Sequence, residues 1–297
     1  MDGNLECREQ APRNLRIAGI QMVSGPDVPE NLAAASRLLD AAVHAGAGAV
    51  LFPEFFPVFG TGRVPRALWE PLGRGPIQDW LREQASARGI WIFSGSLPIA
   101  APDAPRPCNT LLAIDPHGNC VARYDKIHLF AFAQGKERHD EADFIHAGER
   151  PVALETPFGR VGFSICYDIR FPELYRQLGR LDLILLPAAF TEPTGRAHWQ
   201  ILLRARAIEN QCYLLAAAQG GRHANDRLTH GHSMVIDPWG EILDCKGKGE
   251  GIVLAELDHA RIAQVRRELP ALEHRRLVDG SLVDGNAPAA APAFTRT

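Results

Sequence analysis

Hydrophobic and polar positions in the first part of the chain predict strands that alternate with helices. Apolar residues spaced three and four apart over Pro29–His44 predict an amphipathic helix. Short, almost continuous apolar runs over Leu15–Met22 and Ala49–Pro53 predict strands that are covered on both faces. A second helix is predicted over Pro76–Arg88, and a third strand over Ile90–Ser96.

The next stretch of the chain predicts a β-hairpin followed by an irregular segment. Two runs, Asn109–Asp115 and Asn119–Asp125, flank the sequence Pro116-His-Gly118, which supplies turn residues. Beyond them, Ala131–Gly148 is polar and has no clear period. A segment of this length without regular structure is often functional, so we expect it to border a site.

The second part of the chain repeats the pattern of the first. Alternation from Val161 to Cys166 predicts a strand, and Pro172–Leu178 predicts a helix that Gly179 ends. The later elements are predicted as a strand over Leu181–Pro187, a loop over Phe190–Arg196, a helix over Ala197–Asn210, a strand over Cys212–Gln219, a hairpin of Gly231–Asp237 and Glu241–Cys245, a strand over Gly251–Leu257 and a helix over His259–Arg267.

Because both halves run strand, helix, apolar strand and end in a hairpin, they predict two similar sheets packed face to face. With helices outside, this is a four-layer α-β-β-α sandwich of the α/β class, and a single doubly wound sheet is the alternative. We expect residues 1–14 to form a flexible leader, residues 15–285 a single domain, and residues 286–297 a tail that is rich in Ala and Pro.

Composition narrows the class of partner. The 297 residues carry a formal net charge of −3, which gives no electrostatic reason to expect nucleic acid or a membrane surface as partner. Six cysteines without a Cys-x-x-Cys pair argue against a zinc ribbon or a disulfide framework, and they favour a reducing, cytoplasmic location. His230-Gly-His232 is a weak metal signal, so neither a metal nor an organic cofactor is expected.

Three predicted strands end in residues that can carry chemistry. Cys166 stands before a turn into a helix, although a lone cysteine is more often simply buried. Glu54 lies among aromatic residues, where burial would favour its protonated form and make it a usable base, or it could hold loop amides. Lys126 could stabilise an anion or face solvent. Together the three supply a thiol, a base and a cation.

Several motifs, in order, make the chain resemble the nitrilase, or carbon–nitrogen hydrolase, superfamily over about residues 15–276. They are Leu51-Phe-Pro-Glu-Phe55, Tyr124-Asp-Lys-Ile-His-Leu129, Ile165-Cys-Tyr-Asp-Ile-Arg-Phe-Pro-Glu173, Thr194-Gly-Arg-Ala-His-Trp199, Leu203-Arg-Ala-Arg-Ala-Ile-Glu-Asn210 and Gly231-His-Ser-Met-Val-Ile-Asp-Pro-Trp-Gly240. The phrases from Ala197 to Gly240 look most like the Nit branch, and Arg266–Pro270 with His274–Arg276 is most similar to its deaminated-glutathione type. The Ala131–His139 segment lacks the Asp-x-x-x-Pro-Gly pattern that is expected of eukaryotic Nit members.

The resemblance implies a catalytic Glu-Lys-Cys triad at Glu54, Lys126 and Cys166, with a second glutamate at Glu141 or, in competition, Glu137. It implies an amidase that splits a small carboxylate-bearing amide to an acid and ammonia through a thioester on Cys166. Deaminated glutathione is the expected substrate. Amides of the 2-oxoglutaramate type, nitriles, N-carbamyl compounds, acyl transfer to an amine and a catalytically silent interaction protein are the alternatives.

Four further residues are expected to contact substrate. The backbone of Tyr167 would help Lys126 to hold the oxyanion, and Arg170 would bind a substrate carboxylate or else pair with Glu173 or Asp168. Phe190 and Thr194 are expected on a loop after the Leu181–Pro187 strand. Lys126 and a helix N-terminus after Cys166 are expected to favour the thiolate near neutral pH. The resemblance also implies a homodimer or a higher homo-oligomer.

Overall fold

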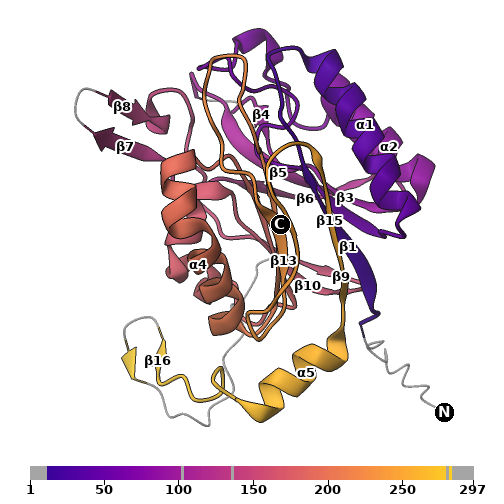
Figure 1. Ribbon diagram of the computed structural model, residues 1–297, viewed down its shortest axis with the longest axis vertical. Coiled ribbons are helices and arrows are strands. Elements are labelled where there is room, and N and C mark those ends of the chain that lie inside the picture. Colours follow the sequence, from indigo (N-terminus) through magenta and orange to yellow (C-terminus); the bar gives the residue numbers. More distant parts are fainter. Residues whose placement is uncertain (1–11, 102–103, 135–136, 279–280, 283–297) are drawn as a thin grey trace, which may run out of the picture.

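Two β-sheets face each other between outer layers of helices (Figure 1). The computed structural model describes residues 12–101, 104–134, 137–278 and 281–282. Helices α1 (Val28–His44) and α2 (Pro76–Arg88) lie on one outer side, and α4 (Glu192–Asn210) lies on the opposite side (Figure 1). The predicted four-layer α-β-β-α sandwich is therefore confirmed, and the alternative of one doubly wound sheet is wrong.

The first sheet has the strand order β15-β1-β2-β3-β5-β4, and β6 pairs with β5. Strands β1, β2 and β3 run parallel to one another, so their carboxyl ends meet at one edge of the sheet. The bounds are β1 Leu15–Gln21, β2 Ala49–Leu51, β3 Trp91–Phe93, β4 Leu97–Ile99, β5 Cys108–Ile114, β6 Cys120–Asp125 and β15 Gly251–Leu257.

The second sheet has the order β14-β13-β12-β11-β10-β9, with β10, β11 and β12 parallel. Its bounds are β9 Ala153–Thr156, β10 Gly159–Phe163, β11 Leu183–Ala188, β12 Tyr213–Ala218, β13 Ser233–Ile236 and β14 Ile242–Lys246. The next strand in the chain, β15, belongs to the first sheet. It pairs antiparallel with β1, from Leu15 opposite Leu257 to Gln21 opposite Gly251. The second half of the chain thus completes the first sheet.

Local signals in the sequence explain where the helices begin and end. The Asp27 side chain caps α1 by accepting a hydrogen bond from the Glu30 N–H, and Gly89 ends α2 in the left-handed conformation that glycine tolerates, at φ 64°. Helix α4 begins at Glu192, five residues before the predicted Ala197, because Pro193 is compatible with the first turn of a helix. The remaining helices are α3 (Pro172–Gln177) and α5 (His259–Glu268).

Alternation along β1 divides the core into two layers. Ile17 packs in the cluster between the two sheets, whereas Ala18 and Ile20 pack in the cluster under α1 and α2. Gly19 has a specific reason to lack a side chain, because a Cβ there would lie 3.1 Å from Leu215 of the facing sheet. Glycine at this position lets the two sheets approach closely, and this brings their strand ends together.

The Ala131–Gly148 segment, predicted as irregular, holds a small hairpin. Strands β7 (Ala131–Gln134) and β8 (Glu137–Asp140) pair antiparallel and project from the body of the molecule (Figure 1). Single 3₁₀ turns occur at Glu141–Asp143, Cys166–Arg170 and Arg66–Leu68. Strands β4 and β9 and the two-residue strands β16 (Leu277–Val278) and β17 (Ser281–Leu282) were also not predicted. All of these are too short to show a hydrophobic period.

The two terminal segments of the sequence prediction fall largely outside the described residues. The predicted leader, residues 1–14, is described only from residue 12, and the predicted tail, residues 286–297, is not described. Within the part of the chain that the structure describes, every helix is too short or too polar to cross a bilayer.

Candidate active site

The ends of three strands bring together the residues that the sequence singles out. Glu54 follows β2, Lys126 follows β6 directly, and Cys166 lies three residues beyond β10. The Lys126 Nζ lies 2.9 Å from Glu54 Oε1, and both side chains are buried. A buried ammonium and carboxylate require each other, because either one alone would carry a large desolvation cost.

A second carboxylate completes the surroundings of Lys126. Glu141 Oε2 lies 2.7 Å from Lys126 Nζ and also accepts the Phe130 N–H at 2.8 Å. Glu141 sits at the start of the 3₁₀ turn after β8 and is 4% exposed. The competing Glu137 lies on β8, and its side chain is outside the described residues. The geometry favours Glu141 as the second glutamate of the site.

Asn109 joins the two carboxylates, and the sequence analysis did not single it out. Its Nδ2 donates to Glu54 Oε1 at 2.9 Å and to Glu141 Oε1 at 3.3 Å. The side chain is fully buried on β5, and its Oδ1 has no partner within the described residues. One signal in the sequence could have identified it: Asn109 is a polar residue at the start of an apolar strand that is covered on both faces, and a buried polar side chain needs hydrogen-bond partners.

Cys166 has an unusual backbone conformation that Asp168 supports. Its φ is +48°, in the left-handed region that non-glycine residues seldom adopt, and it begins the 3₁₀ turn. The buried Asp168 carboxylate accepts the Ile165 N–H at 2.8 Å and the Tyr124 hydroxyl at 2.7 Å. Its other oxygen accepts the His128 N–H at 3.1 Å. Asp168 therefore ties the cysteine turn to the strand that delivers Lys126.

Burial and neighbouring charge set the protonation state of the site. Burial would lower the pKa of Lys126, but Glu141 and Glu54 outweigh burial and raise it, so the ammonium stays charged. For Cys166 the direction is opposite to the sequence prediction. Burial raises the pKa of the thiol well above 9.0, Glu54 raises it further, and Lys126 and the Ala189 N–H offset only part of this.

The prediction that Lys126 and a helix N-terminus lower the pKa of Cys166 is therefore wrong, and two features explain why. The helix-like segment at Cys166 is a single 3₁₀ turn of five residues, which is too short to supply a strong N-terminal dipole. In addition, the Glu54 carboxylate raises the pKa of the buried thiol further, whereas Lys126 lowers it by less than burial and Glu54 raise it. Burial and Glu54 therefore oppose ionisation of Cys166.

One cavity of about 1040 Å³ contains all of the predicted residues. This volume is typical of a site for a small organic molecule. The predicted residues that line it are Glu54, Lys126, Glu141, Cys166, Tyr167, Arg170, Phe190 and Thr194.

The predicted substrate-binding residues lie on the wall of this cavity beside Cys166. The Arg170 guanidinium lies over the rings of Tyr167 and Phe190, at 5.6 and 5.4 Å, and 3.2 Å from His198 Nδ1. This arrangement differs from the considered pairing with Glu173 or Asp168. Thr194 lies in the first turn of α4, and not on a loop, with its hydroxyl 2.7 Å from that of Thr191.

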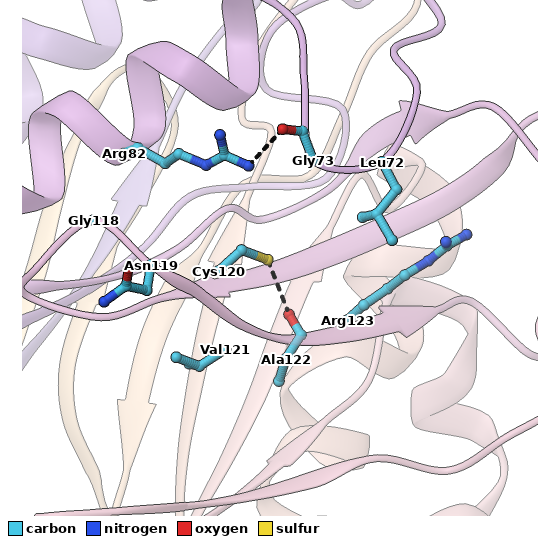
Figure 2. A pocket seen from close by; sticks show the side chains of 9 residues that line it. All are labelled: Leu72, Gly73, Arg82, Gly118, Asn119, Cys120, Val121, Ala122 and Arg123. Atoms are coloured by element: carbon cyan, nitrogen blue, oxygen red, sulfur yellow. Dashed lines mark hydrogen bonds between the residues drawn. The ribbon is translucent and has the colours of Figure 1, made fainter. Parts of the chain in front are cut away.

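Two other parts of the molecule contain cysteine or histidine but do not combine a nucleophile, a base and a cation. A more open hollow of about 570 Å³ contains Cys120, whose Sγ lies 3.7 Å from the Ala122 carbonyl oxygen, and none of its nine lining residues is a carboxylate (Figure 2). The rings of His230 and His232 stack with centroids 4.2 Å apart. Over the described ranges, no three His, Cys, Asp or Glu side chains converge to hold a metal ion.

Comparison with known proteins agrees with this geometry. The family model of the carbon–nitrogen hydrolases matches residues 16–267, which is most of the chain. The chain belongs to the carbon–nitrogen hydrolase family. The predicted family is thus confirmed, and the protein is an enzyme that hydrolyses carbon–nitrogen bonds other than peptide bonds.

Relatives of this carbon–nitrogen hydrolase cover nearly its whole length. A Synechocystis protein named deaminated glutathione amidase is 43% identical over 269 residues, which are 88% of this chain and 98% of the relative. The solved structure of Saccharomyces cerevisiae Nit3, described as a member of the nitrilase superfamily, is 28% identical with a TM-score of 0.79, over 87% of this chain and 95% of that one.

A third relative shows covalent chemistry at a cysteine. A Glu-to-Gln mutant of an amidase from Nesterenkonia sp., 28% identical with a TM-score of 0.68 over 86% of this chain and 98% of that chain, is described as showing the result of Michael addition of acrylamide at the active site cysteine.

Proposed function

We propose that this carbon–nitrogen hydrolase is an amidase that acts on a small carboxylate-bearing amide, with deaminated glutathione as substrate and Cys166 as nucleophile. The observation that carries the proposal is the contact of Lys126 with both Glu54 and Glu141 in the cavity that also contains Cys166. Relatives named deaminated glutathione amidase, such as the Synechocystis protein, support the choice of substrate.

The first half of the reaction forms a thioester. Glu54 takes the proton of the Cys166 thiol as the sulfur attacks the amide carbon, so that no free thiolate has to form in the buried cluster. The negative charge moves to the substrate oxygen, where Lys126 and the Tyr167 N–H stabilise it. Each such donor contributes roughly 3–4 kcal/mol to transition-state stabilisation. Glu54 then gives its proton to the departing nitrogen, and the carbon–nitrogen bond breaks.

The second half releases the acid. Glu54, now a carboxylate again, takes a proton from water as the water oxygen attacks the thioester. Collapse of this intermediate returns the proton to sulfur and frees the carboxylic acid. Glu141 and Asn109 act by holding Lys126 and Glu54 in place. Water is the second substrate, and its oxygen ends in the carboxylic acid.

Ammonia, the product expected from the sequence, is not the product that this substrate would release. Deaminated glutathione joins a 2-oxoglutaryl group to cysteinylglycine through a secondary amide. The departing nitrogen is therefore the amine of cysteinylglycine, and ammonia leaves only from primary amides such as 2-oxoglutaramate. The large cavity, about 1040 Å³, has room for a leaving group of dipeptide size.

Arg170, Phe190 and Thr194 would hold the acyl part of the substrate. Arg170 is fixed over two aromatic rings, which orients its planar donors for a carboxylate. Phe190 is buried at the base of this arginine and offers an apolar surface. Thr194 supplies a hydroxyl from the first turn of α4.

The test is product analysis on a substrate panel. Purified protein should release 2-oxoglutarate from deaminated glutathione faster than from 2-oxoglutaramate, and a nitrile and an N-carbamyl compound should be poor substrates. Faster turnover of 2-oxoglutaramate would assign it as an omega-amidase instead. Cys166→Ala should be folded and inactive, and retained turnover in this variant would end the proposal.

Two substitutions separate the roles of the other two residues. Glu54→Gln should stop turnover, and wild-type rates in this variant would remove Glu54 from the mechanism. Lys126→Arg keeps the charge but changes its shape. A loss below about tenfold, or 1.4 kcal/mol, would show that Lys126 is not a close oxyanion donor.

We also propose that residues 15–285 form one catalytic domain that assembles into a homodimer or higher oligomer in the cytoplasm. Large apolar side chains on and beside α4 are exposed, with Ile201 at 70%, Ile208 at 45% and Trp239 at 48%. The five described cysteines are free thiols, which fits a reducing compartment. Light scattering on Ile201→Asp against wild type would test the assembly, and an unchanged mass would exclude this face.

A further inference from the structure

The cavity contains a second arginine on a segment far in sequence from Arg170. Arg227 lines it, and the guanidinium lies over the Phe59 ring at 5.2 Å. The side chain is half-buried, and within the described part of the chain it forms no ion pair. An arginine held on an aromatic face with its donors free is well suited to bind a carboxylate.

Hydrogen bonds hold the turn that carries Arg227. The His223 N–H donates to the Arg227 carbonyl at 2.9 Å, and the Asp226 N–H donates to the His223 carbonyl at 2.9 Å. The buried His223 ring is fixed by Ser24 O and Thr229 Oγ1, both at 2.8 Å, and lies 4.4 Å from the Phe59 ring. Arg227 is therefore positioned before any ligand arrives, which lowers the entropy cost of binding.

The acidic groups around the cavity leave this arginine available. Glu192 is bound by Lys248 and Arg196, and three hydrogen bonds keep its pKa near 2 despite partial burial, which acts in the opposite direction. Asp226, next in sequence, pairs with Arg222 at 3.1 Å. The remaining acidic residues that line the cavity, apart from Glu54 and Glu141, are Asp140 and Asp143 at the 3₁₀ turn of Glu141.

We propose that Arg227 binds a second substrate carboxylate, in the leaving-group part of the amide. This inference rests on the proposed function. Arg170, four residues from Cys166, would take the carboxylate of the acyl part, and Arg227 would take one beyond the scissile bond. The substrate class is an amide with a carboxylate on each side of that bond, as in deaminated glutathione. Arg227 is then a specificity-determining residue.

A two-by-two comparison of enzyme and substrate tests this role. Wild type and Arg227→Gln are assayed with deaminated glutathione and with its analogue in which the glycine carboxylate is a carboxamide. For wild type, loss of the carboxylate should lower kcat/KM about five- to tenfold, mainly through KM, as expected for one partly exposed charge-assisted contact. For Arg227→Gln, the two substrates should be hydrolysed equally well.

Controls separate this inference from the proposed function. Arg37→Gln, a charge change at an exposed arginine of α1 outside the cavity lining, should keep the wild-type discrimination. Full discrimination retained in Arg227→Gln would overturn the inference. Discrimination lost in Arg63→Gln, at the third arginine of the cavity lining, and kept in Arg227→Gln would overturn it as well. Wild type that hydrolyses neither compound would overturn the proposed function itself.

Discussion

Glu54→Gln is expected to make the Cys166 thiol more acidic, and Lys126→Met is expected to make it less acidic. Burial and the Glu54 carboxylate raise the pKa of this thiol, whereas Lys126 lowers it. Glu54→Gln removes a charge that raises the pKa, and Lys126→Met removes one that lowers it. A charge in contact with a titrating group commonly shifts its pKa by about 1–3 units. We expect shifts of about that size, downward in Glu54→Gln and upward in Lys126→Met.

The raised pKa of Cys166 in the wild-type protein is also a prediction. Because burial and Glu54 raise the pKa of the thiol, the thiolate should be a minor species at neutral pH. The assay is the rate of alkylation by iodoacetamide between about pH 6 and pH 10, followed on the Cys166 peptide by mass spectrometry. The wild-type rate should keep rising through pH 9, without a plateau. The peptides of exposed Cys120 and Cys245 are internal controls in the same samples.

Two results would refute this reasoning. A wild-type plateau below pH 7 would mean that Cys166 rests as a thiolate and that burial and Glu54 do not raise its pKa. An upward shift in Glu54→Gln would mean that Glu54 acts on the thiol in some way other than by charge. Lys126→Met leaves two buried carboxylates without their cation, so its fold is checked by circular dichroism. The Glu54→Gln result decides the question by itself.

Further predictions concern residues around the site. Asn109→Leu removes two hydrogen bonds to carboxylates and should lower kcat about 10- to 100-fold with little change in KM; a loss below twofold would show that Asn109 only fills space. Asp168→Asn places an amide against buried N–H donors and should lower the free energy of unfolding by about 2–4 kcal/mol in urea titrations. Burial raises the pKa of Glu192, but hydrogen bonds from Lys248, Arg196 and His230 outweigh it and lower the pKa to about 2. The ionised Glu192 therefore stabilises the fold at a pH above its ordinary pKa of 4.5, and this stabilisation is lost as the pH falls towards 2. Glu192→Gln should be less stable than wild type at pH 7 and equal to it near pH 2 in urea titrations.

The long, strongly patterned elements could be predicted from the sequence. Helix α2 and strand β15 have the predicted bounds, Pro76–Arg88 and Gly251–Leu257, because a proline start, a glycine end and a mostly apolar run are local signals. The β7–β8 hairpin could not be predicted, because each strand is four residues long and the segment is mostly polar. The return of β15 to the first sheet is a property of the packing, which no local pattern records.

The candidate site could be predicted in its chemistry but not in its connections. Glu54, Lys126 and Cys166 stand at predicted strand ends, and their residue types and motifs indicated a thiol, a base and a cation, but their spacing could not show that the three side chains meet. Asn109 and Asp168 were missed because their importance comes only from partners that are distant in sequence. Arg227 was missed for the same reason, since its ring partner Phe59 precedes it by more than 160 residues.

The protonation state of Cys166 shows why such connections matter for mechanism. Considered pairwise, a cysteine near a lysine favours a thiolate, and that was the sequence prediction. In the structure Lys126 is shared between Glu54 and Glu141, and all three side chains are buried, so the charge of the ammonium is already balanced by two carboxylates. Burial and Glu54 then outweigh the effect of Lys126 on the thiol, and the pKa of Cys166 is raised. A raised pKa fits the proposed mechanism, in which Glu54 removes the proton during attack as a general base.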